Sequence, residues 1–302
     1  MRPFFLVGPT ATGKSEVAAE VACHCNAEIV GADAFQIYRG LDLLTAKPDR
    51  KTLAKMPHHL LGAIPPSEEM NAEKFRTLAR EAIQKINRNG KAVIVVGGSG
   101  LYIKTLTHGL TPLPGASHGL REQLNQLTPE ELCVRLKKLD PETARTIDQK
   151  NARRLIRAIE ICLLTGKRAS AVVATAGTVA AATCGVFVFR DRDELYDRIN
   201  RRVNAMFANG VVDQLRALKK IGPTAEQTLG LREIQRLLTG EISEKECISQ
   251  IQQATRRYAK RQLTWFRRQT NFSSLNLSRY GLGEAIEWIL REARLTFAHR
   301  DD

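Results

Sequence analysis

The sequence predicts an α/β fold with a parallel sheet at its core and an all-helical domain inserted into it. Short apolar runs, as at 4–7, 93–96 and 185–189, are separated by segments of helical spacing, a pattern typical of buried parallel strands. By contrast, residues 120–166 are rich in helix-forming residues and carry no strand signal. We therefore expect the core to come from residues 1–114 and 184–302, and the helical domain from residues 115–183.

A phosphate-binding loop follows the first apolar run. It is formed by Gly8, Pro9, Thr10, Ala11, Thr12, Gly13, Lys14 and Ser15. The strand at 4–7 and the helical segment at 16–22 give this motif the strand–loop–helix context that it requires. Glycines let the backbone N–H groups surround phosphate oxygens, and the start of the helix adds positive potential. The motif predicts a P-loop NTPase-like core that binds a diphosphate or triphosphate.

Two residues of this loop are predicted to act on the phosphates directly. Lys14 supplies a mobile cation for the terminal phosphates, and the hydroxyl of Ser15 can bind Mg²⁺. The expected cofactor is therefore a magnesium ion, and all eight residues of the loop are expected to bind the oxygens of a diphosphate.

The next strands place a candidate carboxylate near the loop. The segment 27–33 is predicted to be a strand that ends in Asp33, and open α/β sheets place functional groups at such strand ends. The clearest buried strand, 91–96, runs into the glycine-rich turn 97–102, with no nearby acid to hold magnesium for nucleotide hydrolysis. This absence disfavours a nucleotide hydrolase or kinase and leaves Asp33 as the best-placed acid.

The second half of the chain is predicted to return to the sheet and then become helical. A strand is expected at 185–189, and helices from 193 to 239 with breaks at Gly210 and near Gly222. The last long helix is expected at 243–269.

The composition points to a polyanionic partner. Lys and Arg number 46 against 32 Asp and Glu, which gives a formal net charge of +14 and favours nucleic acid or an anionic membrane surface. No apolar run approaches the roughly 20 residues of a membrane span, and no secretory signal is evident. The six cysteines lack paired spacing, which indicates reduced thiols. We expect a cytoplasmic monomer that does not enter a membrane.

Positive charge gathers in two helical runs. One contains Arg153, Arg154 and Arg157 among apolar residues, and the other has six cations within 256–268, no acid, and interleaved aromatic side chains. A phosphate backbone would stabilise such clusters of like charge. A solvated basic face is the alternative, and the overall charge favours nucleic acid.

These segments together resemble the bacterial-type tRNA dimethylallyltransferases. The resemblance runs nearly end to end, and its most specific parts are the phosphate loop, residues 33–38, residues 97–102 and the run 258–267. It implies transfer of a dimethylallyl group from dimethylallyl diphosphate to N6 of the adenosine adjacent to the anticodon. The expected partner is the anticodon stem-loop of tRNA, and the product is N6-(dimethylallyl)adenosine.

The resemblance also implies roles for single residues. Asp33 would be the general base for the poorly nucleophilic N6 amine, an effect typically of about 10²–10⁴-fold. The loop N–H groups, Lys14 and magnesium at Ser15 would stabilise the leaving diphosphate, and Arg202 would lie beside the same phosphates. Contacts with tRNA are expected from Asp33, Ala34, Phe35, Gln36, Gly100, Arg153, Arg154, Leu155, Arg157, Lys260, Arg261, Gln262, Trp265 and Arg267.

Alternatives stay open at this point. A relative that prenylates free adenine nucleotides would use the same loop and Asp33, but would not need the helical insertion or the basic helices. A non-enzymatic RNA-binding protein would not need Lys14, Ser15 and Asp33 intact. Asp33 itself could instead cap the following turn through neighbouring N–H groups, or hold magnesium. The chain also departs from the family pattern at Ala34, Ser99 and Leu231. These departures are expected to bear on how the target base is recognised.

Overall fold

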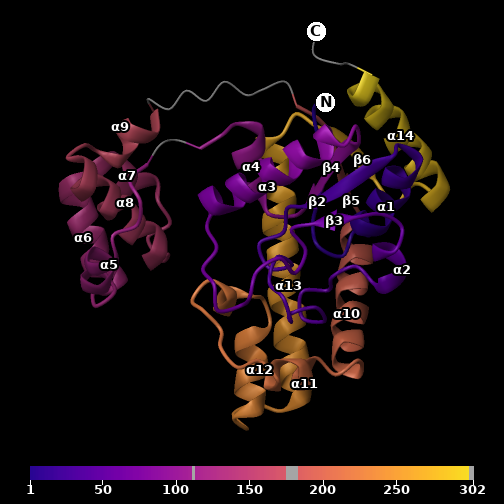
Figure 1. The fold of residues 1–302 in the computed structure, drawn as a ribbon. Helices are drawn as coiled ribbons and strands as arrows, with labels where there is room; N and C mark the ends of the chain where they lie inside the picture. Colours follow the sequence, from indigo (N-terminus) through magenta and orange to yellow (C-terminus); the bar gives the residue numbers. More distant parts are fainter. Residues whose placement is uncertain (111–112, 175–182, 299–302) are drawn as a thin grey trace. The chain divides into compact units, whose positions relative to one another are not determined.

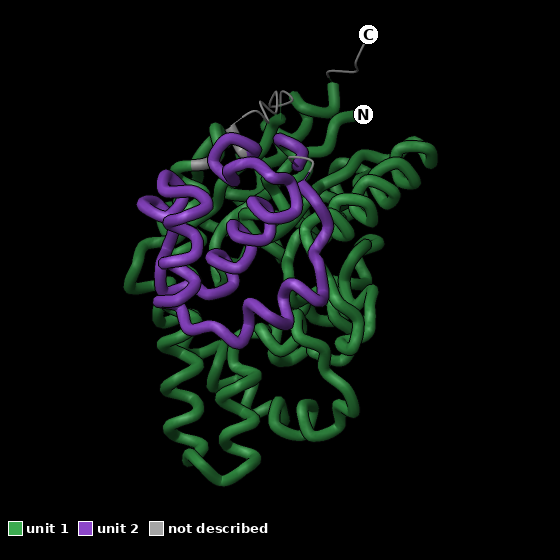
Figure 2. The backbone as a smooth tube through the Cα atoms, turned by 90° about the vertical axis from the view of Figure 1, so that its left-hand side faces the viewer, with its two compact units in different colours: residues 1–107, 181–302 green, residues 108–180 purple. Residues whose placement is uncertain are grey.

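The computed structural model describes residues 1–110, 113–174 and 183–298, and the chain divides into two compact units. Unit 1 combines Met1–Thr107 with Ala181–Asp302, and unit 2 is His108–Ala180 (Figure 2). The divisions thus fall at 107/108 and 180/181, where the sequence suggested 114/115 and 183/184. Part of the second boundary region, residues 175–182, lies outside the described residues.

Unit 1 is built on one six-stranded sheet in which every pairing is parallel (Figure 1). The strand order is β3-β2-β4-β1-β5-β6. The strands are β1 Phe4–Val7, β2 Ala27–Gly31, β3 His58–His59, β4 Ala92–Gly97, β5 Cys184–Phe189 and β6 Ser273–Asn276. The predicted α/β class is confirmed. The two edge strands, β3 and β6, were not predicted, because short edge strands carry little apolar signal.

Helices cover both faces of the sheet because alternate residues of each strand point to opposite sides. Phe4 and Leu6 of β1 pack with α1 (Lys14–His24) and α14 (Leu282–Ala298) on one face. Phe5 and Val7 pack on the other face, against residues of α3, α4, α10 and α13. These helices are α3 Ala72–Arg88, α4 Gly100–Thr107, α10 Arg192–Ala208 and α13 Glu244–Gln269.

Helix α13 corresponds to the long helix expected at 243–269. A capping box begins it: the Ser243 side chain accepts from the Glu246 N–H, and the Glu246 carboxylate accepts from the Ser243 N–H. It is not the last helix of the chain, because α14 follows β6 and completes one face of the sheet. The remaining elements of unit 1 are α2 Arg50–Leu53, α11 Val211–Arg216, the 3₁₀ helix η1 Ala225–Gln227 and α12 Leu231–Leu238.

Helices are the only regular secondary structure among the described residues of unit 2, and they enclose a separate apolar core. They are α5 His118–Leu124, α6 Pro129–Leu139, α7 Pro141–Thr146, α8 Ala152–Thr165 and α9 Ala169–Ala174. A fully buried carboxylate, Glu160, accepts hydrogen bonds from Arg121, Arg157 and the Ser117 N–H. Burial opposes its ionisation, but these donors prevail and keep the pKa of Glu160 below its usual range. The charge is therefore paired inside the unit.

None of the described helices is both long and apolar enough to cross a lipid bilayer.

Candidate active site at the phosphate loop

The phosphate loop lies where the ends of parallel strands approach one another closely. The Gly8 N–H donates to the Gly97 carbonyl at 3.2 Å. A Cβ atom at Gly8 would lie 2.2 Å from the Val188 carbonyl oxygen, and one at Gly97 would lie 2.1 Å from that of Ala32. Gly13 has a φ of 92°, in the left-handed region, and caps the start of α1. Glycine is required at these positions because a side chain has no room or no favourable conformation.

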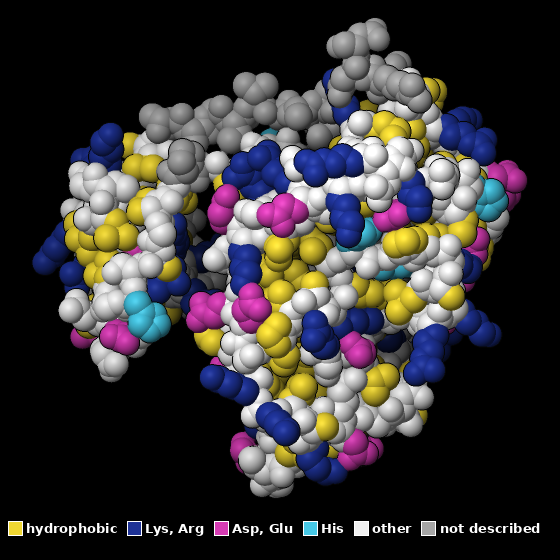
Figure 3. Space-filling view, viewed as in Figure 1, with side chains coloured by type: hydrophobic (Ala, Val, Ile, Leu, Met, Phe, Trp, Pro, Cys, Tyr) yellow, Lys and Arg dark blue, Asp and Glu magenta, His cyan; other side chains and the backbone are white. Residues whose placement is uncertain are grey.

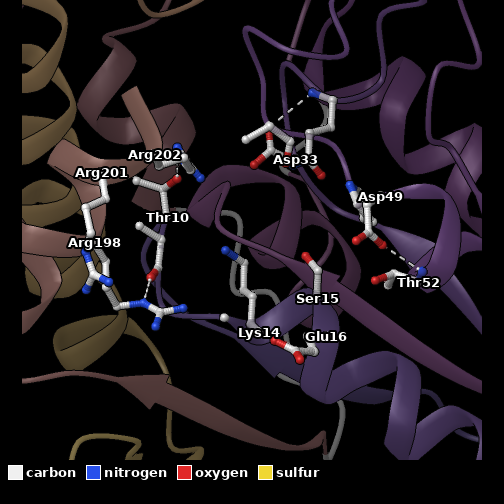
Figure 4. Close-up of a pocket in the computed structure, with 15 residues that line it drawn as sticks. Thr10, Lys14, Ser15, Glu16, Asp33, Asp49, Thr52, Arg198, Arg201 and Arg202 are labelled. Carbon is white, nitrogen blue, oxygen red and sulfur yellow. Dashed lines mark hydrogen bonds between the residues drawn. The ribbon is translucent and has the colours of Figure 1, made fainter. Parts of the chain in front are cut away.

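A cavity of 540 Å³ opens beside this loop (Figure 4). It is lined by Thr10, Ala11, Gly13, Lys14, Ser15, Glu16, Asp33, Gln36, Ala46, Pro48, Asp49, Thr52, Arg198, Arg201 and Arg202. In the close-up, the three arginines of α10 lie at the left and Asp49 at the right, with Asp33 in the upper centre and Lys14 and Ser15 below it (Figure 4). The structure therefore brings the predicted residues Lys14, Ser15, Asp33 and Arg202 to one cavity.

Half-buried cations line one part of this cavity. The Lys14 ammonium donates to the Pro9 carbonyl at 3.1 Å. Burial lowers the pKa of Lys14 to about 8, partly offset by Asp33, and Arg202 adds to the lowering. The pKa of Arg202 is lowered to about 10, also mainly by burial. Its Nε atom is buried and has no hydrogen-bond partner among the described residues. Such cations are stabilised when an anion enters.

Arginines before and along α10 also hold the loop backbone. The Nε of Arg190 donates to the Thr12 carbonyl at 2.8 Å, and the Nε of Arg198 donates to the Ala11 carbonyl at 2.9 Å. One Nη of Arg202 donates to the Thr10 hydroxyl at 2.7 Å. Of these three arginines, only Arg202 was predicted from the sequence to lie beside the phosphates. The spacing of four between Arg198 and Arg202, which places both on one helix face, was the signal for the second arginine.

Asp33 caps a turn and also faces the cavity. Its Oδ1 accepts from the N–H of Phe35 at 3.0 Å and of Gln36 at 3.3 Å. Within the described part of the chain, no hydrogen bond is made to Oδ2. The capping role considered from the sequence is therefore present, and it fixes one carboxylate oxygen while the second is left to accept a proton.

A smaller cavity of 40 Å³ also borders Asp33. Six of its twelve lining residues are apolar or aromatic and four are threonines, and it shares Thr10, Asp33 and Arg202 with the charged cavity. The rings of Phe35 and Tyr258 lie 6.5 Å apart beside it. Burial, followed by the charge of Asp33, raises the pKa of Tyr258, so its hydroxyl stays neutral. The charged cavity and a cavity of mixed polar and apolar lining thus meet at Asp33.

The residues expected to contact tRNA differ in their exposure. Lys260, Arg261 and Arg267 on α13, with Arg153 and Arg154 on α8, are exposed. Lys and Arg side chains are spread widely over the face shown in Figure 3. By contrast, Leu155 is fully buried in the core of unit 2, and Arg157 is bonded to Glu160 at 2.7 Å.

Three further residues of that set serve the site from within unit 1. Gln262 is buried, and Trp265 packs over Gly100, where a Cβ atom would lie 2.4 Å from the indole ring. The Gln36 amide donates to the carbonyls of Thr45 and Ala46 at 3.1 and 3.0 Å. The expectation of direct tRNA contact is therefore corrected for the side chains of Leu155 and Gln262, because helix packing turns both inward.

A model of the family described as IPP transferase matches residues 36–269. The chain belongs to this family. It is 42% identical to tRNA dimethylallyltransferase 1 of Citrifermentans bemidjiense, over 86% of this chain and 87% of that protein. It is also 42% identical to the tRNA dimethylallyltransferase of Akkermansia muciniphila, over 88% and 90% of the two chains. These matches confirm the resemblance found in the sequence.

Solved structures of IPP transferase family members share the fold. A tRNA isopentenylpyrophosphate transferase from Staphylococcus epidermidis is 32% identical, with a TM-score of 0.71 over 98% of this chain and 100% of that chain. A eukaryotic dimethylallyltransferase acting on tRNA superimposes with a TM-score of 0.83 over 99% and 80% of the two chains. At 24% identity, this second likeness bears on the fold alone.

The residues present suit a magnesium ion that arrives with phosphate. The described residues contain no group of three or more His, Cys, Asp or Glu side chains placed to hold a metal. Magnesium usually keeps several waters and is bound through one or two protein groups, commonly carboxylates, together with substrate phosphates. Ser15 lines the charged cavity together with Lys14 and Asp33, so its hydroxyl fits as a ligand of a diphosphate-bound ion.

The lowered pKa of Lys14 predicts a pH dependence of diphosphate binding. Only the protonated ammonium attracts phosphate, so the affinity of the free protein for pyrophosphate should fall as pH rises through about 8. The Lys14→Arg variant keeps its positive charge above that pH and should not show this fall in affinity. It therefore also controls for the ionisation of pyrophosphate itself. Titration calorimetry from pH 6.5 to 9.5 measures the pyrophosphate affinity of the wild type and of the variant. Parallel curves for the two proteins would contradict the assignment.

Proposed function

We propose that the protein transfers a dimethylallyl group from dimethylallyl diphosphate to N6 of the adenosine beside the anticodon of tRNA. The observation that carries this proposal is the meeting of two environments at Asp33. Lys14, Arg198 and Arg202 provide half-buried positive charge in one cavity, and a second cavity with apolar and aromatic residues among its threonines shares Asp33 with the first. Relatives that are 42% identical to the chain are named tRNA dimethylallyltransferases, which supports the same reaction.

The charged cavity suits the leaving diphosphate. As the bond between the dimethylallyl C1 and the diphosphate oxygen breaks, negative charge collects on that oxygen. The loop N–H groups, Lys14 and the α10 arginines are already in place to stabilise this charge, so little reorganisation is needed. Magnesium held with Ser15 would add to the same stabilisation when bound. Thr10, Ala11 and Thr12 are held by the arginines, which keeps the loop in its binding shape.

Asp33 suits the role of general base. The new bond forms between C1 and the adenine N6, which then carries an excess proton. Because Oδ1 is occupied by two backbone N–H groups, Oδ2 is the oxygen that takes this proton. The target base has to leave its stack to reach Asp33, and the rings of Phe35 and Tyr258 lie beside that carboxylate. The exposed cations of α13 would bind the tRNA backbone.

The direct test is incubation with dimethylallyl diphosphate, magnesium and unmodified tRNA, followed by mass analysis of the nucleosides. We expect N6-(dimethylallyl)adenosine at the position beside the anticodon. AMP, ADP and ATP serve as competing acceptors in the same assay. Preferential prenylation of AMP, ADP or ATP would identify a free nucleotide, rather than tRNA, as the acceptor. ATP hydrolysis without prenyl transfer would favour a kinase-like activity.

Asp33→Asn separates the possible roles of this carboxylate. The Asn carbonyl can still accept from the Phe35 and Gln36 N–H groups, so folding and binding of both substrates should change little. Loss of the base should lower the single-turnover rate by at least about 10²-fold at every magnesium concentration. Rescue by excess magnesium would instead identify a metal ligand. A near-normal rate would leave Asp33 with the capping role alone.

Charge reversal tests the basic run of α13. Arg257 and Arg261 are exposed, and their joint replacement by Glu should weaken tRNA binding and reduce its salt slope by about two, because each lost phosphate contact removes about one. Pyrophosphate affinity should stay unchanged. The matched control reverses Lys219 and Lys220, which are exposed outside both basic runs. Equal tRNA affinity in the α13 variant and the wild type would show that the basic face of α13 is exposed to solvent and does not bind tRNA.

A further inference from the structure

Gln262 is a buried amide within an otherwise basic stretch of α13. Its neighbours Lys260 and Arg261 are exposed, whereas Gln262 is 5% exposed. Its Oε1 accepts from the Thr10 N–H at 2.9 Å, and its Nε2 donates to the Gly98 carbonyl at 2.8 Å. Both ends of the amide are therefore satisfied by the main chain, as burial requires. The two bonds join loops that are far apart in the sequence.

Space for this bridge is made by glycine. A Cβ atom at Gly98 would lie 2.3 Å from the Nε2 of Gln262. The Trp265 ring occupies the equivalent space over Gly100, almost one helical turn further along. Helix α13 thus packs against the segment after β4 through the side chains of Gln262 and Trp265, which lie on one face of the helix.

Gln262 joins the phosphate loop to the segment after β4, which in turn contacts the residues that flank Asp33. On one side, the Thr10 hydroxyl accepts from Arg202. On the other, the Ser99 hydroxyl accepts from the Ala34 N–H at 2.8 Å, and the Ser99 N–H donates to the Ala32 carbonyl at 3.2 Å. Ala32 and Ala34 flank Asp33. The bridge therefore ties the phosphate-binding end to the segment that carries the carboxylate.

We propose that Gln262 is a positioning residue that fixes the phosphate loop for diphosphate binding, and that it makes no contact with RNA. Its bond to Thr10 engages one N–H at the start of the loop, which leaves the later N–H groups, near Gly13 and Lys14, to receive phosphate. Holding the loop in one shape before binding removes the cost of ordering it afterwards. The nature of the diphosphate substrate rests on the function proposed above.

The experiment compares Gln262→Leu with Gln252→Leu in the full chain. Gln252 lies on the same helix and donates to the Asn204 side chain at 3.0 Å, away from the loop, so it is a matched control. We expect Gln262→Leu to weaken the binding of inorganic pyrophosphate by about tenfold, against less than twofold for the control. Affinity for tRNA should be unchanged in both variants. Thermal unfolding checks that both proteins are folded.

Gln262→Glu supplies a second test that does not depend on stability. An ionised carboxylate can accept from Thr10 but cannot donate to Gly98, whereas a protonated one can do both. Its pyrophosphate affinity relative to wild type should therefore recover as pH falls from 8 to 5.

Three outcomes would overturn the proposal: normal pyrophosphate affinity in Gln262→Leu, an equal loss in the control, or a lost tRNA affinity that shows RNA contact. A pH-independent ratio for Gln262→Glu would also contradict the two-bond bridge. Pyrophosphate binding requires neither tRNA nor turnover, so failure to prenylate tRNA would refute the proposed function and leave this result standing.

Discussion

Half-buried positive charge at the carboxyl edge of the sheet is the constraint on which the site depends. Lys14, Arg198 and Arg202 line one cavity together with the carboxylates of Glu16, Asp33 and Asp49. Burial lowers the pKa of all three cations, so their charge is costly until an anion arrives. The protein limits this cost by using the same arginines as donors to loop carbonyl and hydroxyl groups. Their hydrogen bonds hold both the cations and the loop in place before a ligand binds.

Close backbone packing makes that arrangement possible. Gly8 and Gly97 bring the ends of adjacent strands within distances that no side chain would permit. The phosphate loop can then lie directly beside the β2–α2 segment that carries Asp33 and the loop that carries Ser99. These main-chain contacts fix the strand ends, and side-chain bonds from Arg190, Arg198, Arg202 and Gln262 then hold the loop. Such rigidity is what stabilisation of a developing charge requires.

Helix α13 connects this interior to the surface. One face carries Tyr258, Gln262 and Phe266 at intervals of four residues, and these side chains pack toward the sheet and the site. The other carries exposed cations. A single rigid helix therefore supports the phosphate loop from within and presents positive charge outside. The tilted ring pair of Tyr258 and Phe35 extends the inward face to the neighbourhood of Asp33.

Local sequence determined the features that depend on local geometry. The phosphate loop needs glycines at fixed spacing between a strand and a helix, and Asp33 directly follows an apolar strand, so both were predictable. Helical periodicity also placed α13 almost to the residue. Which side of a helix faces inward depends on partners distant in the chain, and only the tertiary structure decided that Leu155 and Gln262 are buried and that Arg198 reaches the loop. The bond between Gln262 and Thr10 spans 252 residues, a separation that local propensity does not encode.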